Sequence, residues 1–168
     1  FAYRDANSEK KPNDLNHAIR STAVVATNEW KYHAEMQLNL DESLPMVPCN
    51  IGEINQVVLN LIVNGAHAIR DRFQENQKGT LTVASKHYPD ANCVVISITD
   101  NGGGIPEKVQ SRIFEPFFTT KDVGVGTGQG LAIAHNVIVK SHGGQIWFES
   151  KQGEGTTFHI KLLMSEPS

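Results

Sequence analysis

Apolar and polar positions follow two different periods along this chain. Leu15, Ile19 and Ala23 recur at helical spacing, which predicts a first helix that ends near Trp30. The segment 34–40 instead alternates apolar with polar residues and leads into a proline-containing loop, which predicts a half-buried strand. The chain is therefore expected to begin with a helix followed by a strand.

A longer helix is predicted to begin at Asn50. Asn50 followed by Glu53 is typical of a capped helix N-terminus, and apolar residues then recur as far as Ile69. We expect this helix to end near Phe73.

The C-terminal half shows strand patterns with helices between them. The expected elements are strands over 79–88 and 93–99, a short helix from Pro106, a helix over 130–141, and strands over 145–150 and 156–163. Turn residues join the strands of each pair into a hairpin. The pattern predicts an α/β sandwich (α+β), in which helices cover one face of a mainly antiparallel sheet.

Composition limits the classes of partner. The 168 residues are 39% hydrophobic, enough for one domain with a core, and no run reaches the length of a membrane span. A net charge of -3 shows no basic excess for nucleic acid or an anionic membrane. Cys49 and Cys93 lack the spacing of zinc sites or disulfide frameworks, which favours two buried thiols in a reduced, cytoplasmic setting.

The first residues have the character of a linker. The segment 7–13 is polar and contains a proline, and the chain begins with Phe1 rather than Met. We therefore interpret residues 1–13 as the end of a preceding helix and a linker, and residues 14–168 as the domain.

A narrow polar stripe crosses the apolar helix that begins at Asn50, at about 100° per residue. Its members are Glu53, Gln56, Asn60, Asn64, His67 and Asp71. A solvated helix face is the simplest interpretation. Asn60 and Asn64, however, are poor helix formers placed one turn apart. Two amide oxygens at that spacing can coordinate a hydrated Mg²⁺ ion that also contacts phosphate.

A first glycine cluster follows a predicted strand end. Asp100 precedes the three glycines at 102–104. Its carboxylate can accept a hydrogen bond from an exocyclic amine such as that of adenine, and glycines can admit a flat ring. An Asp-Asn-Gly turn is the alternative, although three successive glycines exceed what a turn needs.

A second glycine-rich segment, 124–131, runs directly into a predicted helix. Such a segment lets backbone N–H groups face a phosphate. A dinucleotide-binding loop fits poorly, because it should open a βαβ unit with an acidic residue about 20 positions further on. The segment 113–121 before it holds three Phe around a Pro. These can fill a core or anchor a lid, with Lys121 available for phosphate.

In order and content these segments resemble the four boxes of the sensor histidine kinase catalytic domain, within the superfamily of gyrase, Hsp90 and mismatch-repair ATPases. The resemblance spans about residues 50–163, and the sequence is closer to the nitrogen-regulation type of sensor kinase. Residues 60–64 resemble the N box, and residues 100–105 resemble the first glycine box. Residues 114–118 resemble the phenylalanine box, and residues 126–131 resemble the second glycine box. Thr156 is similar to the threonine that supports the adenine contact.

The resemblance implies a Bergerat-type ATP-binding fold. Asp100 would accept a hydrogen bond from the adenine amine. Asn64 and Asn60 would hold Mg²⁺ as the catalytic pair, and the second glycine box would close over the phosphates. The expected ATP contacts are Asn60, Asn64, His67, Asp100, Gly102, Gly104, Ile105, Lys121, Gly126, Thr127, Gly128, Gly130, Leu131 and Thr156.

Three residues depart from the usual boxes. His67 and Ala68 stand where many of these kinases carry Lys and an aromatic residue, and Gln129 replaces the usual Leu. We interpret these as subfamily variation. The related hydrolases and the anti-sigma serine kinases place Glu at the position of Asn60, and an amide cannot accept a proton. Transfer to a histidine is therefore favoured over hydrolysis. The alternative is a degenerate nucleotide-binding or partner-binding module without phosphotransfer.

The histidine that accepts the phosphate is expected outside this fragment. None of the seven histidines has the acidic context of a phosphorylated helix, so this fragment should bind ATP without labelling itself. The implied partners are ATP, a dimerisation and phosphoacceptor domain of the parent kinase, and a response regulator. No nucleic acid or membrane contact is expected from the fragment, which we expect in the cytoplasm, whether or not its parent is anchored in the inner membrane.

Overall fold

The computed structural model describes residues 10–74, 77–116 and 130–165. Its strands are β1 (Lys11–Asn13), β2 (Ala34–Asn39), β3 (Val47–Cys49), β4 (Gly79–Tyr88), β5 (Cys93–Asp100), β6 (Gln145–Lys151) and β7 (Gly155–Leu163). Its helices are α2 (Leu15–Val25), α3 (Thr27–Trp30), α4 (Ile51–Arg72) and α5 (Gly130–His135). Three shorter segments are the 3₁₀ turns η1 (Pro89–Ala91) and η2 (Glu107–Arg112) and the π-helical η3 (Asn136–Ser141).

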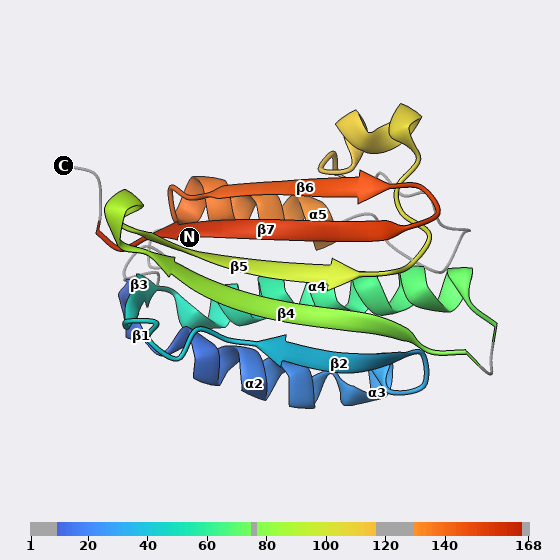
Figure 1. Ribbon diagram of the computed structural model, residues 1–168. Helices are drawn as coiled ribbons and strands as arrows, with labels where there is room; N and C mark the ends of the chain where they lie inside the picture. The colour runs from blue at the N-terminus through green and yellow to red at the C-terminus, as the bar shows by residue number, and fades with distance from the viewer. Residues whose placement is uncertain (1–9, 75–76, 117–129, 166–168) are drawn as a thin grey trace.

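Two layers make up the domain. A five-stranded sheet in the order β2-β4-β5-β7-β6 forms one layer, and α2, α4 and α5 lie together on one of its faces (Figure 1). Only the β2–β4 pair of this sheet is parallel. The α/β sandwich predicted from the sequence, with helices on one face of a mainly antiparallel sheet, is confirmed.

The β4–β5 hairpin is the centre of the sheet. Its residues alternate as the sequence predicts, so that Val83, Ile96 and Ile98 are buried beneath the helices. Asn92 takes a left-handed conformation with φ of 53° in the turn between the strands. β5 runs one residue beyond its predicted end, which makes Asp100 part of the strand.

Helix α4 crosses the whole sheet and carries much of the core. The Asn50 side chain accepts a hydrogen bond of 3.1 Å from the Glu53 N–H, so the predicted cap is confirmed. The apolar face of α4, from Ile54 to Ile69, is buried against the sheet. The helix ends at Arg72, next to the predicted end at Phe73.

Two local features differ from the sequence pattern. The first predicted helix is divided into α2 and α3 at Ala26, where the Thr27 hydroxyl donates to the Val24 carbonyl at 2.6 Å and competes with the regular helix bonds. Residues 11–13, assigned to the linker, form β1 and pair antiparallel with β3. The linker assignment itself stays a prediction.

Both cysteines are buried and free, as predicted. Burial raises the pKa of the Cys49 thiol to about 11, so this thiol is a structural group rather than a nucleophile. Among the described residues, no helix combines the length and the apolar character that crossing a membrane requires.

Candidate functional site

The predicted polar stripe lies along one side of α4. Asn60, Asn64 and His67 are half-buried, whereas Gln56 and Asp71 are exposed. The Gln56 side chain donates a 3.0 Å hydrogen bond to Asn60 Oδ1, which orients the Asn60 amide. Among the described residues, none hydrogen bonds the Asn64 side chain.

Gly65 brings this stripe close to the end of β5. A Cβ at this position would come within 2.6 Å of Leu81 Cδ1 and 3.4 Å of Asp100 Cβ. The glycine therefore lets α4 approach the sheet without displacing the Leu81 side chain, at the usual cost of a glycine inside a helix. The sequence reasoning missed this role, although a glycine inside a predicted helix was a usable signal. As a result, Asn64 lies on the same turn of α4 that faces Asp100.

Asp100 is buried at the sheet end, with 7% of its surface exposed. Its Oδ1 accepts a 2.8 Å hydrogen bond from the Gly102 N–H, which fixes the orientation of the carboxylate. Thr156 on β7 is the cross-strand partner of Asp100 and is also buried. The structure thus brings together the carboxylate and the threonine that the resemblance assigned to the adenine contact.

Ser150 connects several parts of this sheet end. Its hydroxyl lies 2.8 Å from Thr156 Oγ1 and accepts a 2.8 Å hydrogen bond from the Ile105 N–H. Ile105, a predicted site residue, is thereby tied to β6 and β7. No sequence signal pointed to Ser150, because its partners come together only in the folded sheet.

The first glycine box lies against the C-terminal part of α4. A Cβ at Gly102 would come within 2.5 Å of the Ala68 carbonyl carbon, so the two backbones are in close contact. Arg72 donates to the carbonyls of Asn101 at 2.7 Å and Gly102 at 3.3 Å. Gly104 lies against the Lys151 carbonyl of β6. These contacts hold the box between helix and sheet.

The second glycine box is described only at its end. Gly130 begins α5 next to Asn60, since a Cβ on Gly130 would lie 3.8 Å from the Asn60 amide carbon. Leu131 packs against the core. The predicted contacts Lys121, Gly126, Thr127 and Gly128, with Gln129 and the aromatic residues at 117–118, lie outside the described residues.

Phe114 of the phenylalanine box lies against the core. Its ring centroid is 6.0 Å from that of Phe148 and 6.4 Å from that of Phe158, both in edge-on contact. It is also 5.2 Å from the His135 ring on α5. This residue therefore fills a core, the simpler of the two interpretations of the aromatic segment.

His67 makes a contact with the neighbouring helix. Its Nε2 lies 3.9 Å from Glu29 Oε1 on α3. The phosphate contact expected for His67 stays a prediction.

The donor set at Asn60 and Asn64 fits a magnesium ion better than a transition metal. No group of three His, Cys, Asp or Glu residues within the described ranges could hold a metal. Two amide oxygens on successive turns instead suit a hard cation that takes its remaining ligands from water and phosphate. The chemistry of these two donors is therefore compatible with their predicted role.

Gly155 supports Asp100 from the neighbouring strand, and its replacement should be costly. Its φ is 134°, and a Cβ would collide with the Asp100 carbonyl oxygen. We expect Gly155→Ala to lower the free energy of unfolding by about 3 kcal/mol, measured by urea denaturation. Gly153→Ala in the same turn is the control, because its φ is 87° but no atom lies within 4 Å of its Cβ; it should cost about 1 kcal/mol. Equal losses would contradict the collision.

Comparisons with known proteins identify the family of this chain. The family model described as "Histidine kinase-, DNA gyrase B-, and HSP90-like ATPase" matches residues 49–166. The chain is 41% identical over 160 residues to the sensor kinase CckA of Brucella abortus, covering 89% of this chain and 16% of CckA. It spans between 16% and 30% of the length of the curated relatives that it matches.

Solved structures give the same result. The nucleotide-free catalytic domain of the histidine kinase ThkA is 30% identical, with a TM-score of 0.77 and coverage of 93% of this chain and 98% of that domain. ThkA in complex with the response regulator protein TrrA is similar at 27% identity and a TM-score of 0.73, covering 93% of this chain and 42% of that chain.

Proposed function

Since the chain belongs to the family of histidine kinase-, DNA gyrase B- and HSP90-like ATPases, as a histidine kinase catalytic domain, we propose that it binds Mg-ATP and transfers the γ-phosphate to a histidine. The acceptor histidine would belong to a dimerisation and phosphoacceptor domain of the parent kinase. A response regulator would then receive the phosphate in two-component signal transduction.

One observation carries this proposal. The buried carboxylate of Asp100, the Asn64 turn of α4 and the start of α5 at Gly130 converge at one end of the sheet. A carboxylate held by the Gly102 N–H can accept a hydrogen bond from the adenine amine. The asparagines then lie where the phosphates would extend along α4.

The residues at this site favour transfer over hydrolysis. Asn60 offers an amide where a hydrolase needs a base, so water would not be deprotonated there. A neutral imidazole needs no such base, because its unprotonated ring nitrogen is already nucleophilic. It attacks the γ-phosphorus as the bond to the bridging oxygen of ADP breaks. Mg²⁺, when bound, would neutralise charge on the β- and γ-phosphates.

The protein contributes position and selectivity. Asn60 and Asn64 would orient the phosphate end, and Gly130 would place the α5 N-terminus beside it. Asp100 would select adenine, since guanine presents a carbonyl oxygen in place of the amine. The parent's other partners follow by analogy with ThkA, which has been solved with the response regulator TrrA.

Calorimetric titration with a non-hydrolysable ATP analogue and Mg²⁺ tests the proposal. We expect one analogue to bind per chain, and the matching GTP analogue to bind at least about tenfold more weakly, because guanine would present a carbonyl oxygen to the Asp100 carboxylate in place of a donor. No binding by a protein shown to be folded would instead favour a degenerate module, with His67 and Ala68 as the first residues to examine.

A further inference from the structure

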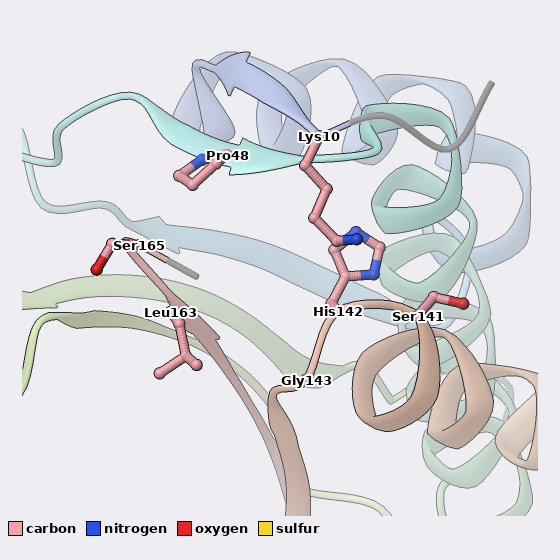
Figure 2. Close-up of a pocket in the computed structure, with 7 residues that line it drawn as sticks. All are labelled: Lys10, Pro48, Ser141, His142, Gly143, Leu163 and Ser165. Atoms are coloured by element: carbon pink, nitrogen blue, oxygen red, sulfur yellow. The ribbon is translucent and has the colours of Figure 1, made fainter. Parts of the chain in front are cut away.

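His142 lies between the start of α4 and the end of η3, far from the candidate site. It follows η3, and its ring sits beside the start of α4. This is the end of the sheet opposite to Asp100, because Leu163 beside it pairs with Cys93 at the start of β5. The ring lines a cavity of about 210 Å³. Figure 2 shows the Lys10 side chain extending toward the ring.

Both nitrogens of this ring are used. Nε2 lies 3.1 Å from the Asn50 backbone nitrogen, and Nδ1 lies 2.8 Å from the Val137 carbonyl oxygen. An amide N–H can only donate and a carbonyl can only accept, so Nδ1 carries the proton and Nε2 accepts. The arrangement requires the neutral ring.

Each bond holds a different helix. Asn50, which donates to the ring, also caps α4 through its side chain. Val137 belongs to η3, the continuation of the α5 helix that starts at Gly130. The same two helices meet again at the site, where Gly130 lies beside Asn60.

We propose that His142 is a positioning residue for nucleotide binding, and that its neutral ring keeps the helix after the second glycine box in register with α4. This inference rests on the proposed function, because it assumes that both helices contact the nucleotide. The ring touches neither phosphate nor adenine. It acts at a distance, by setting where Gly130 and Asn60 lie relative to each other.

Acid should release this connection. A proton on Nε2 would face the Asn50 N–H, so that two donors would oppose each other. Burial lowers the pKa of His142, while the hydrogen bond to the Val137 carbonyl raises it. Among the described residues, two charged groups act on the ring: the Lys10 ammonium before β1 lowers the pKa, and the Glu53 carboxylate on α4 raises it.

The direction of the effect follows from linkage. The folded pKa is below the ordinary value of about 6.5, so the unfolded chain takes up the proton first as pH falls. The contribution of His142 to the free energy of unfolding is therefore fully present above about pH 6.5 and is lost progressively below it. The adjacent cavity gives solvent access to the ring.

Two substitutions separate the ring's chemistry from its volume. His142→Phe keeps a ring but removes both hydrogen bonds. His142→Gln offers an amide oxygen to the Asn50 N–H and does not titrate. His17→Gln is the matched control, because His17 is an exposed histidine on α2. Circular dichroism would check that each variant is folded.

The test is calorimetric titration with a non-hydrolysable ATP analogue and Mg²⁺ from pH 8 down to the lowest pH at which the wild type stays folded. Dividing each variant's Kd by the wild-type Kd at the same pH removes the titration of the phosphates. At pH 8 we expect His142→Phe to bind about three- to tenfold more weakly and His142→Gln nearly as well as wild type. As the pH falls below the lowered folded pKa of His142, the wild type should come to bind about three- to tenfold more weakly than His142→Gln.

Parallel pH profiles for wild type and His142→Gln would overturn the inference while leaving the proposed function intact. This comparison decides the matter even if His142→Phe fails to fold. No binding by folded wild-type protein at pH 8 would overturn both proposals together. A pH-dependent difference that also appears in His17→Gln would assign the effect to surface charge and likewise contradict the role of His142.

Discussion

Asp100→Asn is expected to weaken binding of a non-hydrolysable ATP analogue by about 10- to 100-fold in calorimetric titration, with little change in the fold. The asparagine can still accept the hydrogen bond that the Gly102 N–H donates to Oδ1, so the local backbone should keep its conformation. It replaces the other carboxylate oxygen by an NH₂ group. That group would face the adenine amine as a second donor.

A control and a contrary outcome make this result specific. Asp90→Asn removes the same charge from an exposed residue of η1, far from the predicted site, and should leave the Kd unchanged. Unchanged affinity in Asp100→Asn, with an unchanged melting temperature, would mean that adenine is bound elsewhere. The proposed direction of ATP along α4 would then be wrong.

Asn64→Ala is expected to remove most of the Mg²⁺-dependent part of the affinity. The Asn64 amide is half-buried on the turn of α4 that faces Asp100, and no described residue hydrogen bonds it. Its loss should cost roughly 10- to 100-fold in Kd when Mg²⁺ is present. In EDTA the wild type and the variant should bind the analogue equally, because the metal ligand no longer matters.

The matched control lies on the same helix. Asn55 is also half-buried, but its Oδ1 lies 3.5 Å from the Thr22 hydroxyl on α2, away from the polar stripe. Asn55→Ala should keep the full difference between Mg²⁺ and EDTA. If Asn64→Ala weakened binding equally in both conditions, Asn64 would contact the nucleotide directly and the metal assignment would fail.

Much of the architecture could be predicted because it rests on local periodicity. The alternation in β4 and β5 fixes which side chains face α4, and the Asn50 cap fixes where α4 begins. The break at Ala26 was not predictable in this way. It depends on a side-chain hydrogen bond of Thr27 that the apolar spacing does not record.

The same distinction between local and long-range features applies to the residues of the site. Asp100 and Thr156 were identified by their place in motifs, and the sheet register puts them opposite each other. Gly65 and Ser150 were missed because their roles exist only between elements: one permits a helix to approach a strand, and the other connects three backbone segments. The bonds of His142 to Asn50 and Val137 belong to the same class.

The strand order has a consequence for how the chain acquires its activity. β4 and β5 are joined by a tight turn and can pair early, whereas β5 must wait for β7, which comes after most of the chain. Within this domain, the Asp100–Thr156 pair can therefore close only after β7 has been made. During synthesis, a chain that has not yet emerged through β7 lacks the Asp100–Thr156 pair of the proposed adenine site, so nucleotide bound there would stabilise only a domain that contains β7.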